Sequence, residues 1–340
     1  MDIFISSRIS KNWLDKLSPY FEHMDHYEWS EKGLLSPEDF RDRSKNAHVI
    51  ITESDMISNE TLLQNPNLFI IADFRGTVIN IDVKLATELG IIIMNTPGRN
   101  ADAVADLTIA FMIMASRKVL LAIKAMEAGL WTKEGKYWMY NTHQGYDLPG
   151  KTIGLIGLGA IGKLVAERLV GFKTRIIGYD PYVDKDEIGK FGIELVSKDD
   201  VFRQSDFVSL HLPLNDETKG IYGLKELSLM KSGSYLINTS RAAVFVESEL
   251  IEFLESGKIA GAAIDVYHNE PLDANYPLFH IPNVICTPHI GGATLDVVNH
   301  QCEIGVNSLI QFLEGKTPSN IINPAALEKS REKLKKCSSK

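Results

Sequence analysis

The chain has 340 residues, and because domains typically hold about 100–200 residues, this length predicts two of them. Its composition, 44% hydrophobic and 24% charged, excludes collagen-like and disordered classes. The formal net charge of −8 argues against a surface that binds nucleic acid or an anionic membrane. The acidic start and the lack of an apolar run of about 18 residues predict neither a secretory signal nor a membrane helix. Three widely spaced cysteines indicate a reducing, cytoplasmic compartment and no metal site; they are Cys286, Cys302 and Cys337.

Short β-branched runs alternate with helical segments, which is typical of parallel α/β layers. Two helix starts are well marked: Ser36 precedes Pro37 and two acidic residues, and Asp82 precedes a run that Gly90 closes. Strands are expected at residues 2–6, 47–52, 68–73 and 91–95. These elements predict a first α/β unit, which ends at the turn-rich segment 95–100, a candidate hinge.

The second half of the chain predicts another α/β unit. Before it come an amphipathic stretch, 101–126, and a segment rich in Trp and Tyr, 131–147, which is expected to be irregular. Strands are expected at residues 152–157, 175–180, 207–213, 234–239, 260–266 and 284–287, and a last helix at 295–313. The Lys- and Arg-rich end of the chain is expected to be a solvated tail.

A G-x-G-x-x-G motif lies between a predicted strand and a predicted helix. Gly157 would make the tight turn, Gly159 would let backbone N–H groups approach a pyrophosphate, and Gly162 would let helix and strand pack closely. Asp180 ends the next strand, where an acid accepts hydrogen bonds from a ribose diol and repels a 2′-phosphate. No basic residue follows directly, so the motif predicts a domain that binds NAD rather than NADP.

Three side chains capable of keto-acid chemistry each follow a separate predicted strand. Arg241 could hold a carboxylate, His289 could exchange a proton with a carbonyl oxygen, and Glu270 could orient the imidazole. Singly, each has an ordinary structural reading: a surface charge, a helix-cap neighbour and a turn residue. Together they are expected at the carboxyl edge of one parallel sheet, where α/β proteins build their ligand site.

These motifs resemble the D-isomer-specific 2-hydroxyacid dehydrogenases, NAD-dependent enzymes that include a phosphoglycerate dehydrogenase-like branch. The resemblance covers residues 45–325 and rests on the glycine motif and on the segments 238–241, 261–271 and 287–292. It implies that Arg241 grips the substrate carboxylate, that His289 is the acid/base, and that Glu270 holds its ring. The implied reaction interconverts a D-2-hydroxy acid and its 2-keto acid by hydride transfer.

The resemblance also implies the remaining site residues. Substrate would be bound by Arg75, Gly76, Arg241 and His289. NAD would be bound by Gly157, Gly159, Ala160, Ile161, Gly162, Asp180, His211, Pro213, Thr218, Thr239, Asp265 and Gly291, with Asp265 on the nicotinamide carboxamide.

The implied fold class is α/β with two doubly wound parallel-sheet domains and the active site in the cleft between them. A flavodoxin-like substrate domain would comprise residues 1–101, completed by 299–330, and a Rossmann NAD-binding domain would comprise 102–298, leaving 331–340 as a flexible tail. The helix near Ala101 and the Trp- and Tyr-rich loop would form a homodimer interface.

Two other functions stay open at this point. The first is a short D-3-phosphoglycerate dehydrogenase without a regulatory domain; Val78 and Ile79 depart from that branch, although Arg75 and Gly76 could still bind an anion. The second is an NAD(H)-sensing interaction protein of the corepressor type, which would keep the same Arg, Glu and His. Arg99 is expected to be a solvated turn residue, and Glu53 a surface acid.

Overall fold

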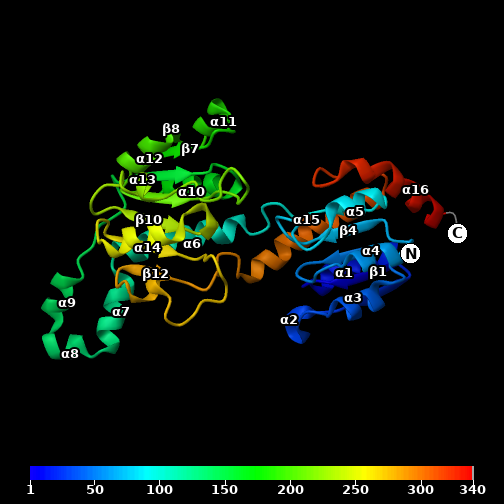
Figure 1. The fold of residues 1–340 in the computed structure, drawn as a ribbon, viewed down its shortest axis with the longest axis horizontal. Helices are drawn as coiled ribbons and strands as arrows, with labels where there is room; N and C mark the ends of the chain where they lie inside the picture. The colour runs from blue at the N-terminus through cyan, green and yellow to red at the C-terminus, as the bar shows by residue number, and fades with distance from the viewer. Residues whose placement is uncertain (339–340) are drawn as a thin grey trace. The chain divides into compact units, whose positions relative to one another are not determined.

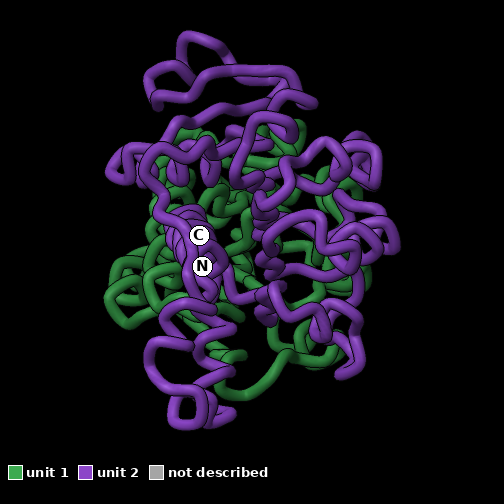
Figure 2. Tube along the Cα trace, turned by 90° about the vertical axis from the view of Figure 1, so that its left-hand side faces the viewer, with its two compact units in different colours: residues 1–100, 294–340 green, residues 101–293 purple. Residues whose placement is uncertain are grey.

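The computed structural model describes residues 1–338, which form two compact units, each built on one parallel sheet. Unit 1 comprises Met1–Asn100 and the chain from Thr294 onward, and unit 2 comprises Ala101–Ala293 (Figure 2). The chain therefore passes between units at 100/101 and 293/294, whereas the family resemblance implies crossings at 101/102 and 298/299. Within the described residues, no helix has both the length and the apolar character needed to span a membrane.

Unit 1 has a five-stranded sheet in the order β2-β1-β3-β4-β5. Its strands are β1 (Asp2–Ser6), β2 (His23–His26), β3 (Val49–Thr52), β4 (Ile70–Asp73) and β5 (Ile92–Met94). The inner strands are continuous apolar runs because helices cover both faces of a parallel sheet. The strand order reverses between β1 and β3, which is where open α/β sheets leave room for ligands.

Two helices of unit 1, α3 and α5, begin at the caps that the sequence predicts; Figure 1 shows where the helices lie. Ser36 accepts a hydrogen bond from Asp39 N, and Asp82 accepts one from Leu85 N. The helices are α1 (Lys11–Leu17), α2 (Trp29–Lys32), α3 (Pro37–Ser44), α4 (Asn59–Gln64), α5 (Val83–Glu88), α15 (Leu295–Leu313) and α16 (Leu327–Ser338), with 3-10 helices η1 (Ser18–Tyr20) and η4 (Pro324–Ala326).

The prediction of a flexible tail from residue 331 onward is wrong for residues 331–338. Helix α16 continues to Ser338, and Leu334 and Cys337 pack against the core of unit 1. Ser330 Oγ and Lys333 Nζ donate hydrogen bonds to the carbonyls of Phe69 and Leu68, both at 2.8 Å. A few apolar side chains on one helix face outweigh the basic composition on which the expectation rested. Residues 339–340 lie outside the described residues.

Unit 2 has a seven-stranded sheet in the order β12-β11-β10-β9-β6-β7-β8, which reverses between β6 and β9. Its strands are β6 (Thr152–Ile156), β7 (Arg175–Tyr179), β8 (Ile193–Leu195), β9 (Phe207–Leu210), β10 (Tyr235–Asn238), β11 (Gly261–Ile264) and β12 (Val284–Cys286). The elements around it are α6 (Ala101–Ser116), α10 (Ala160–Val170), α11 (Lys185–Gly189), α12 (Lys198–Gln204), α13 (Leu224–Leu227) and α14 (Glu247–Glu255), with η2 (Ala242–Val244) and η3 (Pro277–His280). Alternate strand residues enter two buried clusters, as expected for a sheet covered on both faces.

Most of the segment 131–147, which is expected to be irregular, forms helices instead, and the part after Thr142 lacks regular structure. The chain turns at Lys118, whose φ is +52°, and continues as α7 (Val119–Glu127), α8 (Leu130–Glu134) and α9 (Lys136–Thr142). We call these three helices the arm; they extend away from the sheet of unit 2 (Figure 1). The arm exposes large apolar and aromatic side chains, namely Ile123, Met126, Trp131, Tyr137, Trp138 and Tyr140.

Candidate active site

The glycine turn lies at the point where the strand order of unit 2 reverses. Gly157 has φ +90°, and a Cβ there would lie 2.5 Å from the carbonyl oxygen of His211, so only glycine fits. A Cβ on Gly162 would lie 2.3 Å from the carbonyl oxygen of Gly157. Nothing lies within 4 Å of the Cβ position of Gly159, so the turn is open there. Helix α10 starts at Ala160 without a side-chain cap, which leaves its N-terminal N–H groups free for phosphates.

Asp180 is directly connected to this turn. Its Oδ2 accepts a hydrogen bond from Leu158 N at 2.9 Å, and its Oδ1 accepts one from Tyr182 N, also at 2.9 Å. The carboxylate thus joins the end of β7 to the turn after β6. Because a carboxylate has about four acceptor positions, two remain for the hydroxyls of a ribose.

The other predicted cofactor residues follow β9 and β10. His211 Nε2 lies 3.0 Å from Ser209 Oγ, and burial lowers the pKa of His211 to about 3, so its ring is neutral. Thr218 Oγ1 donates to the carbonyl oxygen of Pro213 at 2.7 Å, which closes the loop after β9. Thr239, after β10, has its Oγ1 3.0 Å from Thr108 Oγ1 on α6. These residues lie in the segments that follow β9 and β10, and the neutral imidazole adds no charge there.

Arg241 follows β10 and is exposed. Its Nη1 donates to the carbonyl oxygen of Ser240 at 2.7 Å, and no acidic side chain among the described residues pairs with it. Asn238 shapes the turn, because its side chain accepts from Ser240 N and donates to the carbonyl oxygen of Arg241. The guanidinium is therefore available to a carboxylate.

His289 and Glu270 form a hydrogen-bonded pair. His289 Nδ1 lies 2.7 Å from Glu270 Oε2, and Glu270 Oε1 accepts from Tyr267 N at 2.9 Å, which orients the carboxylate. Nδ1 faces an acceptor and carries a proton, so Nε2 is the nitrogen left for chemistry. A cavity of about 700 Å³ adjoins the pair and includes Phe279 and Cys286 in its lining.

Asp265 holds the loop that carries His289. Its Oδ1 accepts from Ile290 N at 2.9 Å and from Thr287 Oγ1, and its Oδ2 accepts from Gly291 N at 2.7 Å. His289 adopts φ +53°, a left-handed conformation that a non-glycine residue rarely adopts without such support. Three of about four acceptor positions on Asp265 are used within the chain, and one remains for a cofactor amide.

The predicted substrate residues of unit 1 follow β4. Arg75 is half-buried, donates from Nη1 to the carbonyl oxygen of Glu53 at 3.3 Å, and forms no ion pair among the described side chains. Gly76 is exposed, and its carbonyl oxygen accepts from Asn95 Nδ2 at 2.8 Å.

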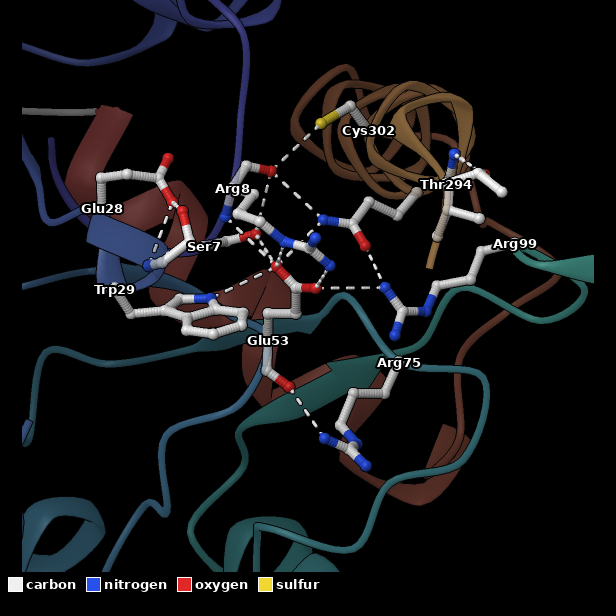
Figure 3. Close-up of polar contacts among 12 residues, drawn as sticks. Ser7, Arg8, Glu28, Trp29, Glu53, Arg75, Arg99, Thr294 and Cys302 are labelled. Atoms are coloured by element: carbon white, nitrogen blue, oxygen red, sulfur yellow. Dashed lines mark hydrogen bonds and ion pairs between the residues drawn. The ribbon is translucent and has the colours of Figure 1, made fainter. Parts of the chain in front are cut away.

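The expectations for Glu53 and Arg99 are wrong. Glu53 is only 1% exposed, and Arg99 Nη1 donates to Glu53 Oε1 at 3.3 Å (Figure 3). The neighbouring sequence contains only polar turn residues, which is why it indicates solvent exposure. The signal that could have found this cluster is position: Glu53 directly follows β3, and Arg8 lies two residues after the end of β1 in the same sheet.

The open parallel sheet, the glycine turn and the imidazole–carboxylate pair define an NAD-binding oxidoreductase. The model of the D-isomer specific 2-hydroxyacid dehydrogenase NAD-binding domain matches residues 109–291. A glyoxylate reductase of Thermococcus litoralis is 36% identical over 96% of this chain and 98% of its own length. A glyoxylate reductase of Aeropyrum pernix is 36% identical over 94% of this chain and 95% of its own.

Solved structures agree with this assignment. A glyoxylate reductase from Paecilomyes thermophila has a TM-score of 0.79 at 29% identity, covering 95% of this chain and 98% of that one. D-lactate dehydrogenase from Escherichia coli has a TM-score of 0.76 at 26% identity, covering 95% of this chain and 100% of that one. The chain belongs to the D-isomer specific 2-hydroxyacid dehydrogenase family. It is an NAD-dependent oxidoreductase that acts on a CH–OH group, as the motifs predict.

Proposed function

We propose that this protein reduces small, unphosphorylated 2-keto acids of the glyoxylate and hydroxypyruvate type to the corresponding 2-hydroxy acids, with the D configuration wherever C2 becomes a stereocentre. The observation that carries the proposal is the 2.7 Å contact between His289 and Glu270, together with an exposed Arg241 that pairs with no acidic side chain among the described residues. The relatives named glyoxylate reductase support the substrate class. Phosphoglycerate dehydrogenase and the corepressor-type sensor are not favoured by these comparisons.

In this mechanism, Arg241 binds the substrate carboxylate through its planar guanidinium fork. Bound NADH supplies the hydride that reduces the carbonyl carbon. His289 donates a proton from Nε2 to the carbonyl oxygen, so the carbonyl group gains a hydride at carbon and a proton at oxygen. Glu270 keeps the Nδ1 proton in place and stabilises the imidazolium before transfer. In the reverse direction neutral His289 accepts the hydroxyl proton.

Unit 2 is the domain that holds the cofactor in this proposal. The N–H groups at the start of α10, Ala160 and Ile161 included, bind the pyrophosphate, and Asp180 accepts from the ribose hydroxyls. The free acceptor position on Asp265 takes the nicotinamide carboxamide. His211, Pro213, Thr218, Thr239 and Gly291 complete the surface against which the dinucleotide lies.

Unit 1 contributes Arg75 and Gly76 to substrate binding. The argument is that Arg75 follows a strand at the carboxyl edge of the sheet and forms no ion pair among the described residues. Guanidinium and backbone N–H groups both donate to carboxylate oxygens.

NADH oxidation by the purified protein, followed at 340 nm on a panel of 2-keto acids, tests the proposal. Glyoxylate and hydroxypyruvate should be turned over, with phosphohydroxypyruvate at least about tenfold poorer in kcat/KM. Tight NADH binding without turnover of any panel member would contradict the proposal and would favour a sensing role.

We also propose a homodimer assembled through the arm, in the cytoplasm. The arm exposes Trp131 at 50%, Tyr137 at 74% and Tyr140 at 73%, more aromatic surface than an unpartnered helix usually shows. All three cysteines are free thiols, as is usual in a reducing compartment. Light scattering should give twice the chain mass for the wild type and a lower mass for Tyr137→Glu/Tyr140→Glu; a monomeric wild type would overturn the dimer.

A further inference from the structure

A cluster of polar side chains fills the carboxyl edge of the sheet in unit 1, around Glu53 (Figure 3). Arg8 lies two residues after the end of β1, and Glu53 is the first residue after β3. The two residues therefore flank the point where the strand order reverses. Arg99 reaches the same carboxylate from the segment after β5, and Gln301 reaches it from α15. This is the position at which open α/β sheets bind their ligands.

The carboxylate of Glu53 is saturated with donors from the chain itself. Its Oε2 accepts from Arg8 Nε at 3.3 Å, from Gln301 Nε2 at 3.1 Å and from Trp29 Nε1 at 3.3 Å. Its Oε1 accepts from Arg8 Nη2 and from Arg99 Nη1. Arg8 therefore grips it as a two-pronged fork, the geometry with which arginine binds carboxylate or phosphate ligands. No acceptor position remains with which Glu53 could contact a substrate hydroxyl.

The buried carboxylate of Glu53 is ionised and balances the charge of the arginines around it. Burial opposes its ionisation, yet hydrogen bonds from Arg8 and the charges of Arg8 and Arg99 hold the pKa of Glu53 below its ordinary value. Two guanidinium groups, those of Arg8 and Arg99, pair with this carboxylate, and a third, that of Arg75, donates to the backbone carbonyl oxygen of the same residue. Without it, three arginines after three strands of one parallel sheet would form a binding site for a doubly charged anion.

We propose that Glu53 is a specificity-determining residue: its carboxylate occupies, as part of the chain, the place that the phosphate of a phosphorylated substrate would take. The inference rests on the proposed function, and in particular on Arg75 as a substrate contact. Glu53 lowers the positive charge of the cluster and uses the donor fork of Arg8. The site then accepts 2-keto acids that carry a free hydroxyl group. The phosphate group of a phosphorylated substrate would instead be repelled by the fixed negative charge of Glu53.

Glu53→Gln tests the proposal, because it keeps the size of the side chain and removes its charge. The ratio of kcat/KM for phosphohydroxypyruvate to that for hydroxypyruvate should rise at least about tenfold. Inorganic phosphate at millimolar concentration should raise Tm in the variant and leave the wild type unchanged. The matched control is Glu28→Gln, which removes another acid facing Arg8 that is not hydrogen-bonded to it in the described chain. Its ratio should stay within about twofold of the wild type.

A second variant keeps the proposal testable if Glu53→Gln does not fold. Glu53→Asp keeps the charge and shortens the side chain by one methylene, so it cannot reach both Arg8 and Arg99; a ratio between those of wild type and Glu53→Gln is expected. A folded Glu53→Gln protein with an unchanged ratio and no phosphate effect on Tm would overturn the proposal. So would the failure of both variants to fold, because the carboxylate would then serve the fold alone.

The effect of inorganic phosphate on Tm distinguishes failure of this inference from failure of the proposed function. If wild-type protein turns over none of the keto acids but Glu53→Gln binds phosphate, the proposed function fails and the assignment of Glu53 stands. If hydroxypyruvate is reduced but neither readout responds to Glu53→Gln, the proposed function stands and the assignment fails.

Discussion

Nδ1 of His289 lies 2.7 Å from Oε2 of Glu270, and this contact decides which ring nitrogen is left for substrate. The carboxylate is itself fixed by Tyr267 N, and the His289 loop is fixed by Asp265. Two acids with separate tasks thus place one imidazole: Glu270 sets the proton on the ring, and Asp265 sets the backbone that carries it. Such positioning supports proton transfer, which requires a donor within hydrogen-bond reach of the carbonyl oxygen.

His289→Asn should lower the rate of turnover strongly and leave cofactor binding intact. Removing a general acid costs about 10²–10⁴-fold in rate, and the asparagine retains a polar side chain of similar reach beside Glu270. Single-turnover kinetics would measure the first effect and NADH fluorescence titration the second. An equal loss of NADH affinity would instead assign a structural role to the histidine.

Arg241→Ala should lower kcat/KM for 2-keto acids by at least about 100-fold, the loss expected for a charge-assisted bidentate contact. The dissociation constant for NADH should change less than about threefold, because Arg241 is not among the proposed cofactor residues. Arg175→Ala is the matched control, since this arginine is 48% exposed in the same unit and pairs with Glu194. Retention of most activity by Arg241→Ala would refute the carboxylate role.

Asp180→Asn should weaken the preference for NADH over NADPH. The wild-type carboxylate repels a 2′-phosphate, whereas the amide removes the charge and keeps an acceptor for Leu158 N or Tyr182 N. We expect the NADPH/NADH ratio of kcat/KM to rise about tenfold in the variant. A wild type that already prefers NADPH would show that Asp180 does not select the cofactor.

Ionisation of the buried Asp73 carboxyl should lower the stability of the folded protein as pH rises. Burial raises the pKa of Asp73 to about 7, against the opposing charges of Arg75 and Arg99 and with Glu53 adding to the rise. Neither of its oxygens has a hydrogen-bond partner among the described residues. The unfolded chain loses this proton near pH 4 and the folded chain near pH 7, so the folded state binds more protons between these values. The free energy of unfolding therefore falls across this range, by at most about 4 kcal/mol.

Asp73→Asn removes this titration. Its free energy of unfolding, measured in urea at pH 5 and at pH 8, should fall less between the two than that of the wild type. Asp42→Asn, at a side chain 73% exposed, is the control and should follow the wild type. Parallel curves for wild type and Asp73→Asn would show that Asp73 is ionised at both pH values.

Several features of this protein follow from its sequence because their physical causes are local. The helix caps at Ser36 and Asp82 depend on side chains within three residues of the N–H groups they satisfy. The glycine turn depends on backbone conformation and on the residues of one strand–turn–helix segment. Arg241, Glu270 and His289 could be selected because the carboxyl ends of parallel strands always meet at one edge.

Other features depend on contacts between distant residues, so local composition predicts them wrongly. The arm looks irregular because glycine and aromatic residues interrupt it, and α16 looks like a tail because it is rich in lysine. Glu53 lies in a polar turn that would ordinarily be solvated; Arg8, Arg99 and Gln301, as many as 248 positions away in the chain, converge on it and bury it. The sequence thus determined the chemistry that each strand end can offer. The tertiary structure alone decided which charges meet, because charge pairing depends on distances that only the folded chain defines.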